Sequence, residues 1–174
     1  MVRALLERLP QVRLAVSATT RMQRPGETDG VEYWFLTRDE FDRRIANGEF
    51  LEWVDYVGNR YGTLRAEIER IQREGGVAVL ELELDGALTV KDVMPNAVTV
   101  FVDAPLEELE RRLGERATES AGEIGERIDL ARHQKELAGR FDHVVENDDR
   151  ERAAAEVVEI VRRELNDAAT MAPR

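Results

Sequence analysis

Hydrophobic and polar residues along this chain follow two different periods. Segments in which they alternate predict strands, and segments in which apolar residues recur every three or four positions predict helices. Strands are expected at 12–17, 32–36, 50–57, 60–63, 77–84, 97–102 and 141–146. Helices are expected at 2–9, 40–47, 64–74, 105–116, 119–137 and 148–166. This alternation predicts an α/β fold, a parallel sheet flanked by helices, with a small β-rich insertion at 32–60.

Turn and capping residues separate several of these segments. Thr37 and Glu40 match a capping box, which predicts that a helix begins there. Gly48 follows the same helix at the position where glycine commonly ends one. Gly58 and Asn59 predict a tight turn between the two strands that flank them. The local signals therefore agree with the periodicity.

Composition limits the class of protein. A chain of 174 residues with 43% hydrophobic content is large enough for one domain with a core. Its net charge of -11 argues against general nucleic-acid binding, because phosphate backbones would be repelled. There is no cysteine, and the two histidines fall in different segments, so thiolate chemistry and a histidine-based metal site are not expected. Neither an apolar run of about 20 residues nor a signal-peptide core is present, so no membrane association and a cytoplasmic location are expected.

The segment with the clearest chemistry runs from Ser17 to Tyr33 and reads S-A-T-T-R-x-x-R-P-G-E-x-D-G-x-x-Y. It combines hydroxyl groups, two arginines and a phenol. Arginine binds phosphate oxygens bidentately and stays charged at any working pH. The segment therefore predicts a phosphate-binding turn. A capped surface turn with solvated arginines is the alternative interpretation of these residues alone.

This segment resembles the nucleoside-monophosphate-binding segment of guanylate kinases, and the resemblance extends over roughly residues 2–165. It implies a P-loop NTPase-like nucleoside monophosphate kinase fold with a GMP-binding insertion and a helical lid. It also implies one guanylate kinase-like domain over 1–174, with the GMP-binding part at 17–64, the lid at 110–130 and the remainder as core. The residues that match the phosphate-binding positions of the family are Arg21, Arg24, Tyr33 and Tyr61.

The same resemblance implies a set of residues that read guanine. Guanine presents N1–H and a 2-amino group side by side, and one carboxylate can accept from both. Glu52, in G-E-F-L-E-W, matches the glutamate that does this in the family, although a surface glutamate is the alternative. Thr63 and Ser17 match hydroxyl residues nearby. Glu83, in V-L-E-L-E-L-D-G-A, stands where the family usually has an aspartate, and Asp85 stands where it usually has glutamine.

Arginines and an asparagine further along the chain resemble the ATP-facing part of the family. The sequence R-L-G-E-R-A-T-E-S resembles the lid, which makes Arg116 and Arg127 candidate catalytic residues that stabilise the transferred phosphoryl group. The family's usual R-G-T is R-A-T here, and a helix with solvated arginines is the alternative. Asn147 matches a residue that contacts adenine. An Asx turn that caps the last helix would explain the same Asn-Asp-Asp sequence.

The resemblance implies ATP-dependent phosphorylation of GMP to GDP, with Mg²⁺ carried by ATP and no metal bound by the protein itself. The 174 residues contain no G-x-x-x-x-G-K-[ST] loop, and the first central strand that should precede it is also expected to be missing. The 174 residues are therefore expected to recognise GMP and to transfer little phosphate. The alternative is a catalytically inactive guanylate kinase-like module that binds GMP or a phosphorylated peptide.

Overall fold

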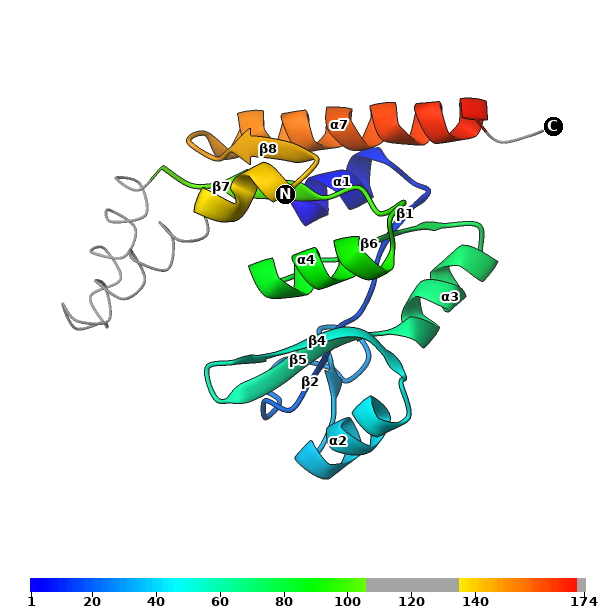
Figure 1. The fold of residues 1–174 in the computed structure, drawn as a ribbon, viewed down its shortest axis with the longest axis vertical. Helices are drawn as coiled ribbons and strands as arrows, with labels where there is room; N and C mark the ends of the chain where they lie inside the picture. The colour runs from blue at the N-terminus through cyan, green and yellow to red at the C-terminus, as the bar shows by residue number, and fades with distance from the viewer. Residues whose placement is uncertain (106–134, 172–174) are drawn as a thin grey trace. The chain divides into compact units, whose positions relative to one another are not determined.

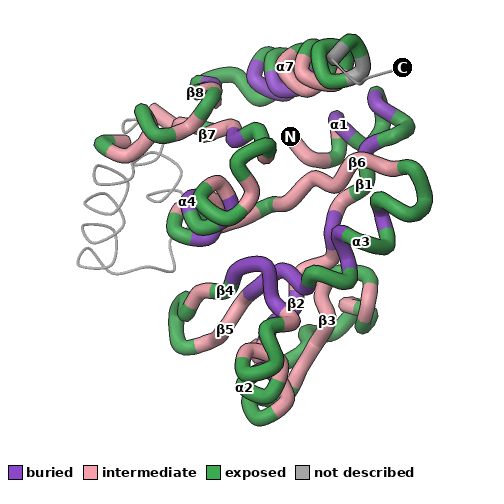
Figure 2. The backbone as a smooth tube through the Cα atoms, turned by 45° about the vertical axis from the view of Figure 1, so that its right-hand side comes forward, coloured by how far each residue is buried: buried purple, intermediate pink, exposed green. Residues whose placement is uncertain are grey.

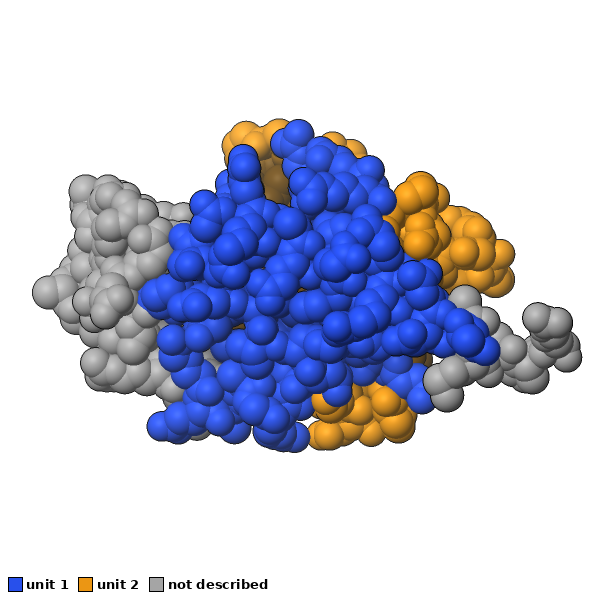
Figure 3. Space-filling view, turned by 90° about the horizontal axis from the view of Figure 1, so that it is seen from above, with its two compact units in different colours: residues 1, 3–8, 96–174 blue, residues 2, 9–95 orange. Residues whose placement is uncertain are grey.

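The computed structural model describes residues 1–105 and 135–171. The chain divides into two compact units, which Figure 3 distinguishes by colour. Unit 1 comprises Met1, residues 3–8 and residues 96–174, and unit 2 comprises Val2 and residues 9–95. The expectation of one domain over 1–174 stays a prediction.

Unit 2 contains two small sheets and three helices (Figure 1). The first sheet pairs two parallel strands, and the second is mixed, with the order β3-β2-β5-β4. The strands are β1 (Val12–Leu14), β2 (Ala18–Thr19), β3 (Trp34–Phe35), β4 (Phe50–Tyr56), β5 (Asn59–Leu64) and β6 (Val77–Val79). The helices are α2 (Arg38–Ala46), α3 (Arg65–Arg73) and α4 (Leu84–Val93). Strand β1 pairs with β6, and α4 lies beside β4.

The core of the mixed sheet lies between its strands and α2. Thr37 caps α2 by accepting a hydrogen bond from the backbone N–H of Glu40, as the capping box predicted. This cap directs Phe41 onto the sheet, where its ring stacks on Phe50 with 4.3 Å between the centroids. Ala18 and Leu64 complete the buried cluster. Figure 2 shows buried positions gathered in β2, β4 and β5.

Unit 1 contains a parallel pair of strands and a long helix. Its elements are most of α1 (Val2–Arg8), β7 (Val100–Asp103), the 3₁₀ turn η1 (Ala138–Arg140), β8 (His143–Glu146) and α7 (Arg150–Met171). Strand β7 pairs with β8 in parallel, and α7 packs against β8. The buried residues of α7 recur at helical spacing, because Ala153, Ala154, Val157 and Val158 share one face.

The predicted α/β class with parallel strands and flanking helices is confirmed. The strand expected at 77–84 is wrong in length, because β6 ends at Val79 and α4 begins at Leu84. Leu84 and Leu88 are four residues apart, which is helical spacing. The alternating leucines before them predicted a strand instead. The helices expected at 105–116 and 119–137, and the lid at 110–130, fall mostly outside the described residues. None of the helices in the described ranges combines the length and apolar character needed to cross a membrane.

Truncation of Phe41 tests the importance of this core. Phe41 is fully buried, so Phe41→Ala removes a stacked ring and leaves a cavity beside Phe50. We expect a loss of about 3–5 kcal/mol in the free energy of unfolding, measured by urea denaturation with circular dichroism. The control is Met22→Ala, whose side chain is 87% exposed and should change stability by less than about 0.5 kcal/mol. Equal effects of the two substitutions would contradict this account.

Candidate nucleotide-binding site

The turn after β2 is anchored to β5 by backbone and hydroxyl groups. The backbone N–H of Thr20 donates to the carbonyl oxygen of Arg60 at 3.0 Å, and the N–H of Arg60 donates to Oγ1 of Thr20 at 2.9 Å. The N–H of Arg21 donates to Oγ1 of Thr19 at 3.1 Å. The hydroxyl groups of Thr19 and Thr20 thus hold the turn, and they set Arg21 beside β5.

Arg21 lies among three aromatic rings. Its Cζ atom is 5.4 Å from the ring centroid of Tyr33 and 5.6 Å from that of Phe35. The rings of Tyr33 and Tyr61 meet edge to face, with 5.9 Å between centroids. Burial is the largest cause that raises the pKa of Tyr33, and Tyr61 and the carboxylate of Glu81 add to it. Three of the four predicted phosphate-binding residues, Arg21, Tyr33 and Tyr61, therefore lie together.

Glu27 holds Arg21 in place. Its carboxylate accepts from Nη2 of Arg21 at 2.8 Å and from Nη1 at 3.1 Å, and it also accepts from the backbone N–H of Arg24 at 2.7 Å. The hydrogen bond from Arg21 is the main reason that the pKa of Glu27 is lowered. The side chain of Arg24 itself is exposed. Glu27 was not among the predicted site residues, although its position three residues after Arg24 in R-P-G-E is a usable signal.

A buried carboxylate lies on the β4–β5 hairpin. Glu52 is 4% exposed and Thr63, its partner across the strands, is 1% exposed. The hydroxyl of Thr63 donates to Oε1 of Glu52 at 2.8 Å. Burial raises the pKa of Glu52, and the hydrogen bonds from Thr63 oppose that rise. A glutamate with this little exposure is not a surface residue, so the alternative interpretation of Glu52 is wrong.

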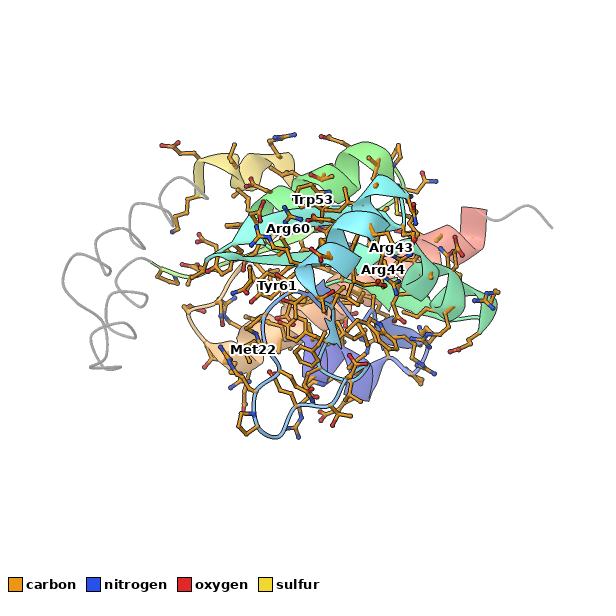
Figure 4. The ribbon with its side chains drawn as sticks, turned by 90° about the horizontal axis from the view of Figure 1, so that it is seen from below. Met22, Arg43, Arg44, Trp53, Arg60 and Tyr61 are labelled. Atoms are coloured by element: carbon orange, nitrogen blue, oxygen red, sulfur yellow. The ribbon has the colours of Figure 1, made fainter. Side chains whose placement is uncertain are left out.

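The hairpin brings the buried carboxylate and the aromatic cluster to one face. Glu52 lies opposite Thr63 and Val54 opposite Tyr61 in the strand register. Because side chains alternate along a strand, Thr63 and Tyr61 point to the same side, roughly 7 Å apart. The other face carries Trp53 and Arg60, whose guanidinium lies 5.5 Å from the indole centroid (Figure 4). One face of β4–β5 therefore presents a carboxylate and a phenol in line.

Ser17 directly precedes β2, and Glu83 directly precedes α4. The carbonyl oxygen of Ser17 accepts from the N–H of Trp34 at 2.9 Å, and the residue is half-buried. Glu83 is the residue before α4, and its side chain is exposed without capping that helix. Partial desolvation, followed by the charge of Asp85, raises the pKa of Glu83. Both residues belong to unit 2, together with Glu52 and Thr63.

The predicted adenine contact, Asn147, lies in unit 1. The backbone N–H of Asn147 donates to the carbonyl oxygen of Asp103 at 2.7 Å. Asp149, rather than Asn147, caps α7 by accepting from the N–H of Arg152 at 2.8 Å. Among the described residues, Oδ1 of Asn147 is buried without a hydrogen-bond partner. Arg116 and Arg127 lie outside the described residues.

Two further features concern ligands. Within residues 1–105 and 135–171, no group of three or more histidine, aspartate and glutamate side chains is arranged to hold a metal ion. A surface hollow of about 730 Å³ lies between β8 and α7, and one of about 370 Å³ lies beside α3. Neither hollow is lined by Glu52, Arg21 or Tyr61.

Comparison with known proteins shows the family of the chain. The guanylate kinase family model matches residues 1–164. The chain belongs to the guanylate kinase family. It is 48% identical to a guanylate kinase of Rubrobacter xylanophilus, over 94% of this chain and 86% of the relative. It is 44% identical to one of Symbiobacterium thermophilum, over 91% of this chain and 76% of the relative. A crystal structure of guanylate kinase from Anaplasma phagocytophilum superposes with a TM-score of 0.76 at 32% identity, covering 94% of this chain and 79% of that one.

Substitution of Glu52 by glutamine tests the cost of burying its charge. Because its pKa is raised, the folded state binds the proton more tightly than the unfolded state does. The wild type therefore loses stability as the pH rises from the ordinary value of 4.5 through the raised pKa. Glu52→Gln keeps an acceptor for Thr63 without a charge. The free energy of unfolding of the variant should therefore exceed that of the wild type by an amount that grows with pH, up to about 1 kcal/mol.

The measurement is urea denaturation at a series of pH values between about 4 and 8, a range that spans the ordinary titration of a glutamate. Glu69→Gln is the matched control, because it makes the same substitution at an exposed position of α3. A difference between Glu52→Gln and the wild type that stays constant or shrinks as the pH rises would contradict the burial of a charged Glu52.

Proposed function

We propose that this chain recognises GMP with unit 2 and that it is an ATP:GMP phosphotransferase. Membership of the guanylate kinase family supports the reaction. The observation that carries the choice of GMP is the buried carboxylate of Glu52, which shares a face of the hairpin with Tyr61. In this proposal residues 17–64 are the GMP-binding part of a single domain over 1–174.

Glu52 reads the guanine base in this proposal. A carboxylate with one oxygen bonded to Thr63 still offers lone pairs on both oxygens, enough to accept from N1–H and the 2-amino group of guanine. Adenine lacks this pair of donors, so it would leave the buried charge unpaired, which costs about 1–3 kcal/mol or more. Thr63, Ser17 and Glu83 are proposed as the neighbouring base-binding residues.

The arginine and tyrosine cluster binds the phosphate in this proposal. Arg21 and Arg24 neutralise the dianion, and the phenols of Tyr33 and Tyr61 donate hydrogen bonds to its oxygens. The two-residue spacing of Tyr61 and Thr63 along β5 supports a ligand that extends from base to phosphate along the strand. A local cluster of this kind can hold an anion although the whole chain has a net charge of -11.

The transfer step uses ATP and Mg²⁺ as substrate. An oxygen of the GMP phosphate attacks the γ-phosphorus of ATP, the bond to the bridging oxygen breaks, and ADP leaves. Bound Mg²⁺ would neutralise charge on the phosphates during this exchange. We propose Arg116 and Arg127 as the catalytic residues that stabilise the transferred group, and Asn147 as an adenine contact.

A second candidate function is binding of GMP or a phosphorylated peptide without transfer. It is favoured by one observation, that these 174 residues contain no G-x-x-x-x-G-K-[ST] sequence. In kinases with that loop, its backbone N–H groups and lysine hold the phosphates of ATP. For Met1–Arg174 by itself, this second candidate predicts that GMP binds well and that phosphate transfer is slow.

Two substitutions separate the base half of the site from the phosphate half. Glu52→Gln should weaken both GMP and guanosine about 10- to 100-fold, since both ligands carry the base. Arg24→Ala should weaken GMP about 10-fold and leave guanosine unchanged, because only GMP carries the phosphate. Isothermal titration calorimetry with the two ligands measures these affinities. Glu69→Gln and Arg38→Ala remove the same charges from exposed positions and should bind like the wild type.

The outcomes also distinguish the two functions. A wild type that fails to bind GMP but binds a phosphoserine peptide would overturn the proposal in favour of the peptide-binding module. Turnover is measured as ADP release from Mg-ATP in the presence of GMP. A turnover rate typical of kinases, roughly 1–100 s⁻¹, would overturn the expectation that these 174 residues transfer phosphate slowly.

A further inference from the structure

Helix α4 approaches the carboxylate of Glu52 at a glycine. Gly86 is buried, and a Cβ atom built on it would lie 2.8 Å from Oε2 of Glu52 and 3.4 Å from Cδ. The next nearest atom, Cβ of Leu82, would be 3.7 Å away, which is an ordinary van der Waals distance. Any side chain at position 86 would therefore meet the carboxylate before it met anything else.

The backbone of Gly86 does not explain the choice of residue. Gly86 lies inside α4 and is absent from the glycines with positive φ in the described residues, so alanine could adopt its conformation. Alanine is also the better helix former of the two. Close approach of the helix to Glu52 is the remaining physical reason for a glycine here, as glycine permits backbone to come near another group.

Glu52 is held from three directions. Oε1 accepts from the hydroxyl of Thr63 at 2.8 Å, and Oε2 faces Gly86. Its backbone carbonyl is also closely packed, since a Cβ atom on Gly62 would lie 2.7 Å from that oxygen. The main chain and both carboxylate oxygens of Glu52 thus each have a fixed neighbour, and two of those neighbours are glycines.

We propose that Gly86 is a positioning residue that sets the plane of the Glu52 carboxylate for guanine. This inference rests on the proposed function, because it assumes that Glu52 accepts from N1–H and the 2-amino group. Two donors held side by side need both oxygens of one carboxylate in a common plane with the base. A methyl group at position 86 turns or displaces Oε2, so one of the two hydrogen bonds is lost while the charge stays in place.

The test is Gly86→Ala, with Gly139→Ala as the matched control. A Cβ atom at Gly139 meets nothing within 4 Å, so the control makes the same substitution without a contact. Affinities for GMP and AMP are measured by isothermal titration calorimetry. We expect Gly86→Ala to lower the ratio of GMP affinity to AMP affinity about 10- to 100-fold, the effect of one hydrogen bond to a charged group, and Gly139→Ala to leave the ratio unchanged.

A second variant separates positioning from damage to the fold. Glu52→Asp shortens the side chain by one methylene and withdraws the carboxylate from position 86. Combined with Gly86→Ala, it should recover part of the GMP to AMP ratio, and the double-mutant cycle should be non-additive. Urea denaturation should show that Gly86→Ala still unfolds in a single cooperative transition, so that a lower ratio of GMP to AMP affinity reflects the position of the carboxylate and not unfolding.

The results of these experiments distinguish a failure of the role of Gly86 from a failure of the proposed function. If the wild type does not bind GMP, the proposed function fails, and the assignment of Gly86 fails with it. If the wild type binds GMP in preference to AMP and Gly86→Ala keeps the same preference, only the role of Gly86 is overturned. Additive effects of Gly86→Ala and Glu52→Asp would also overturn it.

Discussion

The burial of the Glu52 carboxylate is the constraint on which the rest of unit 2 depends. A charge with 4% exposure is tolerated only where polar groups replace the water that it has lost. Thr63 supplies one such group from the facing strand, which requires the register of the β4–β5 hairpin to be correct at that pair. The glycines at positions 62 and 86 then allow β5 and α4 to come close enough to enclose the residue.

The hairpin separates two kinds of chemistry by the alternation of its side chains. One face carries Glu52, Thr63 and Tyr61, and the other carries Trp53 and Arg60. On the second face Arg60 forms ion pairs with Asp42 and Asp55, so its charge is balanced within the fold. A slip of one residue in the pairing would exchange the two faces. The pairing therefore serves the site as well as stability.

Carboxylates also hold arginine side chains in fixed positions in this acidic chain. Glu27 fixes Arg21 through both terminal nitrogens and simultaneously accepts from the backbone of Arg24, which orders the loop around Gly26. Glu67 joins two segments in a similar way, because it accepts from the N–H of Val16 and pairs with Arg70. In a chain with a net charge of -11, arginines without such fixed partners would be drawn to many competing carboxylates.

Local patterns in the sequence were enough to predict the α2 cap at Thr37, the strands of the hairpin and the family, because each depends on neighbouring residues or on a contiguous motif. They failed where tertiary contacts decide. Alternating leucines and glutamates predicted a strand to residue 84, but α4 begins there. The burial of Glu52, the pairing of Glu27 with Arg21 and the approach of Gly86 to Glu52 were not visible in the sequence. Burial and close approach depend on which distant segments pack together, and only the folded chain determines that.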